Sequence, residues 1–135
     1  MNLEIDIDKR IQLAMEGRKK GYNCAQAVVT AFPDILELPQ DVALRLACGF
    51  GGGFGGLQRV CGVLSAMTIL EGFSAEDGVK GKPAVYKVVK RLGEDFEKAC
   101  GSVECRELKA PATGMPCNDI IEKGIRIYHE YLLSK

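Results

Sequence analysis

The sequence lacks tryptophan, has a single histidine and contains no apolar run long enough to cross a membrane. Its longest mostly apolar stretch, residues 60–70, is far shorter than the ~20 residues that span a bilayer. The acidic residues 1–8 lack the apolar core of a secretory signal. The 18 lysine and arginine residues balance 18 aspartate and glutamate residues, and no block of one charge would bind a polyanion. We therefore expect a soluble cytoplasmic protein that binds neither a membrane nor nucleic acid.

Cysteine, in contrast, is abundant, because the chain holds six. Disulfide frameworks belong to oxidising compartments, so this number in a cytoplasmic protein favours metal ligation or redox catalysis. Each cysteine singly also has a simpler interpretation, since free cysteine packs as a small apolar side chain and is among the most buried residue types. A structural helical domain whose cysteines only pack therefore remains one hypothesis.

Apolar residues recur at helical spacing along the chain, with no hairpin signal and no internal repeat. Candidate caps, prolines and glycines separate the segments. The expected helices span Asp6 or Asp8 to Gly21, Asn23 to Phe32, Pro39 to Cys48, Leu57 to Gly72, Pro83 to Gly101, Ser102 to Leu108, and Asn118 or Asp119 to Leu132. The pattern predicts an all-α fold, with five to seven helices in one bundle-like domain over residues 1–135 and a glycine-rich loop.

Residues 48–62 form this glycine-rich segment, which holds seven glycines. Glycine allows positive φ angles and close approach of a backbone to other atoms. The segment carries two phenylalanines rather than the serine and charge of a flexible linker, so we predict an ordered loop at the functional site. Gly51, Gly53 and Gly56 also fit the dinucleotide fingerprint Gly-x-Gly-x-x-Gly, but the surrounding helical segments make nucleotide binding a minor alternative.

Three cysteines fall within one turn of a predicted helix N-terminus: Cys24, Cys105 and Cys117. The unpaired amides and the helix dipole at such an end lower the pKa of a thiol and favour the thiolate, which binds metals and attacks disulfides. Cys61 falls inside a predicted helix, where small neighbours such as Gly62 leave room for a second helix or a compact cofactor. Cys100 belongs to an apolar stripe and is assigned to the core, whereas the pattern does not decide the role of Cys48.

His129 shares a helical face with Glu122 and Arg126, so we expect it to be exposed to solvent rather than to act as a ligand or base. Because it is the only histidine, a Ser-His-Asp hydrolase has no supporting constellation. Cys-x-x-Cys-His is also absent, and we therefore expect no covalently attached haem c.

The order and spacing of the cysteines resemble the redox-active family named for its C_GCAxxG_C_C pattern, over nearly the whole chain. The family's central motif is Cys-Gly-Ala-x-x-Gly, and here residues 61–66 read Cys-Gly-Val-Leu-Ser-Ala, so Val63 and Ala66 depart from it. The resemblance implies thiol redox chemistry or cluster binding, since a related domain in a di-haem cytochrome holds an iron–sulfur centre on cysteines. It also names the residues that we expect to be catalytic and to bind a cofactor or metal: Cys24, Cys61, Cys105 and Cys117, with Gly62 beside the cofactor.

Two functional hypotheses follow. In the first, the four cysteines hold an iron–sulfur cluster or another soft metal for electron transfer. Zinc fits less well, because structural zinc sites use close pairs such as Cys-x2-Cys, and the nearest pair here is Cys100 and Cys105. In the alternative, a thiol–disulfide oxidoreductase cycles between dithiol and disulfide. The partner would be a redox protein or a small-molecule electron donor. The sequence does not identify the metal, and it does not decide whether the chain forms a homo-oligomer.

Overall fold

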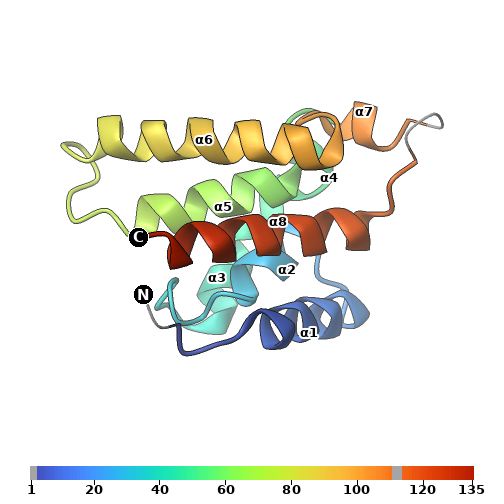
Figure 1. The fold of residues 1–135 in the computed structure, drawn as a ribbon. Helices are drawn as coiled ribbons and strands as arrows, with labels where there is room; N and C mark the ends of the chain where they lie inside the picture. The colour runs from blue at the N-terminus through green and yellow to red at the C-terminus, as the bar shows by residue number, and fades with distance from the viewer. Residues whose placement is uncertain (1–2, 111–113) are drawn as a thin grey trace.

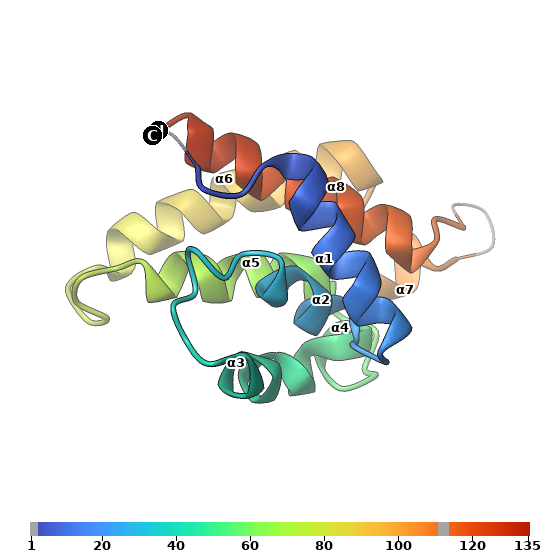
Figure 2. The same ribbon diagram turned by 90° about the horizontal axis from the view of Figure 1, so that it is seen from below.

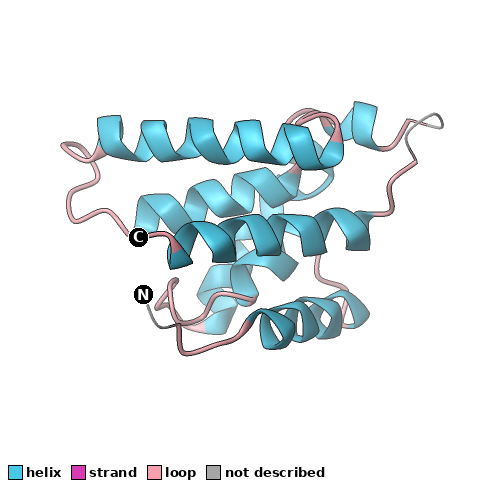
Figure 3. Cartoon of the chain, viewed as in Figure 1, coloured by secondary structure: helices cyan, strands magenta, loops and turns pink. Residues whose placement is uncertain are grey.

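A computed structural model describes residues 3–110 and 114–135. In this part of the chain the only β pairing is an isolated bridge between Val60 and Glu104, so the predicted all-α, bundle-like fold is confirmed (Figures 1 and 3). The helices are α1 (Ile7–Lys19), α2 (Cys24–Thr30), α3 (Gln40–Ala47), the 3-10 turn η1 (Cys48–Phe50), α4 (Gly51–Phe54), α5 (Gly62–Phe73), α6 (Lys82–Cys100), α7 (Cys105–Leu108) and α8 (Cys117–Leu133). None of the described helices is both long and apolar enough to span a membrane.

Two helices organise the packing. The short helix α2 packs against α1, α3, α5 and α8, and α5 packs against α2, α6 and α8. Seen from below, α1 lies across α2 and α8 (Figure 2). The N-terminal ends of α5 and α8 lie at the same end of the bundle as α4 and α7 (Figure 1, right). This end is where the first residues of several helices meet.

Local capping signals form as the sequence predicts. The Asp6 side chain accepts a hydrogen bond from the Lys9 amide at the start of α1. Asn23 and Gln26 form a reciprocal capping box at the start of α2, with distances of 2.8 and 2.9 Å. Gly101 adopts a φ of 97° after the last residue of α6, a conformation that favours glycine and ends the helix. These ends depend only on neighbours in the sequence.

The starts of α5, α7 and α8 differ from the prediction. α7 begins at Cys105 and its N-cap is Glu104, not the predicted Ser102. α5 begins at Gly62 rather than near Leu57, because residues 59–61 pair with the segment before α7: the Cys61 amide donates to the Val103 carbonyl at 2.8 Å. α8 begins at Cys117, ahead of the predicted caps Asn118 and Asp119. Pro116 itself is extended, with φ −61° and ψ 144°, and the helix starts directly after it.

His129 is buried, with 8% of its surface exposed, and the expectation of a solvent-exposed residue is wrong. α1 packs on this face of α8, and the fully buried Arg10 donates from Nε to His129 Nδ1 at 2.9 Å. Arg10 also forms a bidentate ion pair with Asp34, with both distances 2.7 Å. On this face of α8, His129 therefore belongs to a buried hydrogen-bond network, whereas Glu122 and Arg126 form an ion pair exposed to solvent.

Candidate functional site

Four cysteines lie at the N-terminal ends of four different helices. Cys24, Cys105 and Cys117 are the first residues of α2, α7 and α8. Cys61 is the N-cap of α5, one position before its first helical residue, so it does not lie inside a helix as the sequence suggested. All four cysteines line one pocket of about 310 Å³, a volume that includes space open to solvent. The remaining lining residues are Gly52, Gly62, Val63, Leu108, Lys109 and Ile120.

Gly62 is the point where α2 and α5 meet at this pocket. A Cβ atom at this position would lie 2.6 Å from the Cys24 sulfur and 2.7 Å from the Phe50 carbonyl oxygen. Both distances are shorter than real Cβ contacts allow, so only glycine lets the Cys24 sulfur rest against the first turn of α5. The residue that the sequence placed beside a cofactor therefore lies directly against one of the four thiols.

The glycine-rich loop holds Cys105 in place. The Cys105 amide donates to the Arg59 carbonyl at 2.6 Å, at the end of the loop. Gly53 has a φ of 69°, and a Cβ atom there would lie 2.7 Å from the Arg59 nitrogen and 2.9 Å from Cys105 Cβ. The loop thus needs glycine both for its backbone conformation and for its close contact with α7.

The first turn of α8 is fixed by α1. The Arg18 guanidinium donates from Nε to the Asn118 side-chain oxygen at 3.0 Å and from Nη1 to the Tyr22 carbonyl at 3.0 Å. Asn118 directly follows Cys117, so this contact sets the position of α8 where it enters the pocket. The chain segments that bring the four cysteines together are far apart in the sequence.

Burial governs the charge state of two of these thiols. Cys61 and Cys105 are each 5% exposed, whereas Cys24 and Cys117 are half-buried. Burial raises the pKa of Cys61 to about 12, and the neighbouring Cys24 and Cys105 add to the rise while the Val63 amide opposes it. Cys61 is therefore a neutral thiol near pH 7 when no metal is bound.

For Cys105 the expected lowering of the pKa is wrong. Burial raises the pKa of Cys105, and the positive charge of Lys109 only partly offsets that rise. α7 has four residues, too few to build a substantial helix dipole, and the loss of hydration outweighs its effect.

The other two cysteines lie outside the pocket lining. Cys100 is 6% exposed and belongs to the hydrophobic core, which confirms its assignment from the apolar stripe of α6. Cys48 is exposed at the end of α3, where its carbonyl accepts a hydrogen bond from the Asn23 side chain at 2.9 Å. No disulfide joins any of the six cysteines.

The donor set of the pocket fits a soft metal, because the described lining residues supply four thiols and neither carboxylate nor imidazole. As the side chains stand, no three Cys, His, Asp or Glu groups in residues 3–110 and 114–135 are gathered closely enough to hold a metal ion.

The sequence did not single out Lys109 as a lining residue. Its spacing of four residues from Cys105, which puts both on one helical face, is the signal that would have identified it.

The sequence profile of a family described as "Putative redox-active protein (C_GCAxxG_C_C)" matches residues 22–131. This span includes every cysteine of the pocket and the whole glycine-rich loop. Neither a curated protein nor a solved structure gives a significant match to the chain.

Proposed function

Because the chain belongs to the C_GCAxxG_C_C family of redox-active proteins, we propose that its redox centre is an iron–sulfur cluster or another soft metal held by the cysteines of the pocket. The proposed ligands are Cys24, Cys61, Cys105 and Cys117. The observation that carries the proposal is that these residues, from four separate helices, line a single pocket. Iron–sulfur clusters are commonly held by four cysteine thiolates, and they supply one-electron transfer when bound.

The chemistry of Cys61 favours a ligand over an attacking thiol. The thiolate is the reactive form in disulfide exchange, and a thiol with a pKa of about 12 is almost entirely protonated near neutral pH. A bound metal removes this obstacle, because coordination deprotonates the thiol outright. Dithiol chemistry also needs only two cysteines, whereas the pocket collects four.

The surrounding residues would support such a centre. The amides in the first turns of α5 and α8, at the positive ends of these longer helices, offset the negative charge of the thiolates. Val63, Leu108 and Ile120 supply apolar walls that limit the access of water. Gly62 leaves the space that the Cys24 sulfur occupies.

Anaerobic purification followed by absorption spectroscopy and analysis of iron and sulfide tests this function. We expect visible charge-transfer absorption with iron and labile sulfide, and the loss of most of this iron when any of the four pocket cysteines is replaced by serine. Cys48→Ser and Cys100→Ser are the matched controls, since neither residue lines the pocket. Full iron content per folded chain in Cys24→Ser and Cys117→Ser would show that the four residues do not form one centre.

A thiol–disulfide cycle is the second candidate, favoured by the partial exposure of Cys24 and Cys117. In this cycle one thiolate attacks a substrate disulfide and releases one thiolate product. A second pocket cysteine then attacks the mixed disulfide, which releases the other product and leaves an intramolecular disulfide, with two electrons passed to the substrate. A colourless, iron-free protein that reversibly loses two thiols per chain on oxidation would favour this cycle over the metal centre.

A further inference from the structure

Among the described residues that line the four-cysteine pocket, Lys109 is the only charged one. It is the C-cap of α7, four residues after Cys105. Within the part of the chain that the structure describes, none of the ion pairs involves its ammonium group. The pocket therefore combines four thiols with one cation whose charge is not cancelled by a neighbouring carboxylate.

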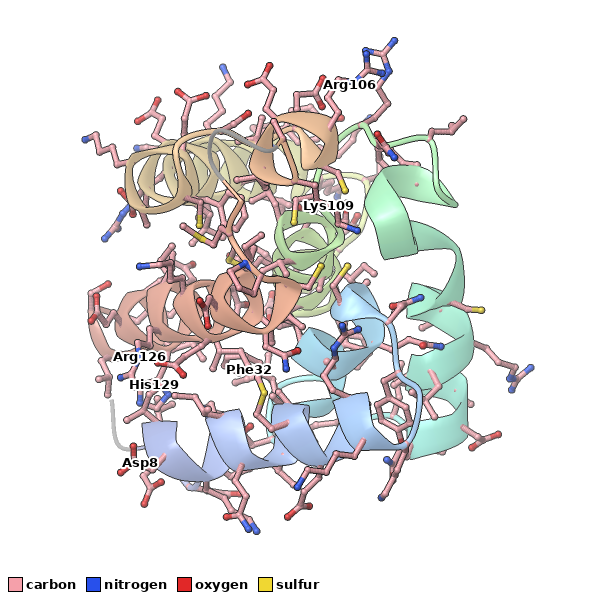
Figure 4. The ribbon with its side chains drawn as sticks, turned by 90° about the vertical axis from the view of Figure 1, so that its right-hand side faces the viewer. Asp8, Phe32, Arg106, Lys109, Arg126 and His129 are labelled. Atoms are coloured by element: carbon pink, nitrogen blue, oxygen red, sulfur yellow. The ribbon has the colours of Figure 1, made fainter. Side chains whose placement is uncertain are left out.

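The direction of the side chain supports an electrostatic role. Lys109 lies between α7 and the end of α5, whereas Arg106, on the same short helix, extends outward from the molecule (Figure 4). Lys109 thus lines the pocket that holds the thiols, whereas Arg106 points away from the molecule.

We propose that Lys109 raises the reduction potential of the redox centre in this pocket, an inference that rests on the proposed function. Reduction by one electron adds one negative charge at the centre, and no covalent bond needs to form or break. The electron comes from an external donor, which is oxidised by one electron. A fixed cation at the pocket interacts more favourably with the reduced form, so it shifts the equilibrium toward reduction. Lys109 therefore changes the reduction potential through its charge alone, and the inference does not require it to contact the electron donor.

The expected effect is moderate, because Lys109 is exposed and its charge is partly screened by solvent. We expect Lys109→Gln to decrease the equilibrium constant for reduction by roughly three- to tenfold, and a tenfold change corresponds to about 59 mV for a one-electron couple. Lys109→Arg keeps the charge and should retain a potential close to that of the original protein.

The test is an anaerobic redox titration of the iron-loaded protein with dithionite as the reductant, followed by visible absorption. Iron content per chain is measured first, in the original protein, Lys109→Gln, Lys109→Arg and Arg106→Gln. Arg106→Gln removes the same charge from the same helix on the side away from the pocket, so its potential should stay nearly unchanged. Added salt should lower the potential of the original protein more than that of Lys109→Gln, because salt screens the lysine charge.

The outcomes separate this inference from the proposed function. The inference is supported if the original protein and all three variants contain the same amount of iron and only Lys109→Gln has a lower reduction potential. Equal iron content with unchanged potential in Lys109→Gln overturns the role of Lys109 and leaves the metal centre standing, and an equal decrease in Arg106→Gln overturns the specific placement. If the original protein takes up no iron, the inference fails, and if metal analysis finds no other soft metal either, the proposed function fails with it.

Discussion

At the scale of single residues, Gly62 has the most demanding position in the pocket. In Gly62→Ala the new methyl group meets the Cys24 sulfur and the Phe50 carbonyl at distances that require a shift. We expect a loss of about 1–3 kcal/mol in the free energy of unfolding and a lower iron content per folded chain. Urea unfolding and iron analysis provide the measurements.

Gly72 of the same helix provides the control. No heavy atom lies within 4 Å of a Cβ built there, and alanine is the better helix former, so Gly72→Ala should stabilise the protein by roughly 0.5–1 kcal/mol without loss of iron. Equal behaviour of the two variants would contradict the proposed contact between Gly62 and Cys24.

The buried ion pair of Arg10 and Asp34 gives a second prediction at this scale. Asp34→Asn would leave the fully buried guanidinium without its charged partner. We expect this variant to lose about 3–5 kcal/mol of stability. Asp41→Asn, which removes an exposed ion pair with Arg45, should cost no more than about 0.5 kcal/mol. Urea unfolding of both variants near pH 7 measures the difference, and similar losses would show that the buried pair has no special role.

His129 makes stability depend on pH. Burial, with the neighbouring Arg10 charge, lowers the pKa of His129 below its usual value of about 6.5. The unfolded chain therefore binds a proton at this side chain more readily than the folded protein does. The stabilising contribution is fully present above about pH 6.5 and is lost as the pH falls through the folded pKa.

We expect the free energy of unfolding to fall between about pH 7.5 and 5, and His129→Gln to flatten this dependence. Asp34 contributes in a separate range: burial alone would raise its pKa, but the hydrogen bond and charge of Arg10 lower it. The stability that Asp34 contributes is lost only below about pH 3.8. Urea midpoints measured at several pH values provide the test. An unchanged slope in His129→Gln would assign the dependence to other groups.

At the scale of secondary-structure elements, the caps of α1 and α2 have similar local energies but different consequences for the pocket. Asn23→Ala and Asp6→Ala each remove a capping side chain, and each should cost about 1 kcal/mol. Of these two helices only α2 begins with a pocket cysteine, and the Asn23 side chain also donates a hydrogen bond to the Cys48 carbonyl at the start of the glycine-rich loop. We therefore expect iron content to fall in Asn23→Ala and to stay unchanged in Asp6→Ala, as measured per folded chain.

At the scale of the whole molecule, the hydrophobic core rather than disulfides holds the fold together. All six cysteines are free, and the core includes fully buried Phe32, Phe96 and Tyr128. Far-UV circular dichroism should show a helical protein whose urea midpoint is the same with and without added reductant in the metal-free form. Loss of cooperative unfolding on addition of reductant alone would contradict both this account and the predicted cytoplasmic location.

The sequence by itself determined the longer helices and most of their ends, whereas it treated η1 and α4 as part of the glycine-rich loop. The family resemblance named the four cysteines that line the pocket. Caps such as Asp6 and Asn23 act on amides three residues away, so they can be recognised without any tertiary contact. For the same reason the sequence placed Cys24 and Cys105 correctly near helix starts. The glycines of residues 48–62 likewise indicate an ordered loop with close contacts, because a backbone can approach other atoms most closely where it carries no Cβ.

Only the tertiary structure decided which helix ends meet and how much water reaches them. The start of α5 moved to Gly62 because Cys61 pairs with Val103, a contact between distant segments. The burial of His129 depends on Arg10, which is 119 residues away in the sequence. The raised pKa of Cys61 likewise results from burial by several helices together. Desolvation and long-range pairing are sums over neighbours from the whole chain, whereas helix periodicity and capping are properties of short segments.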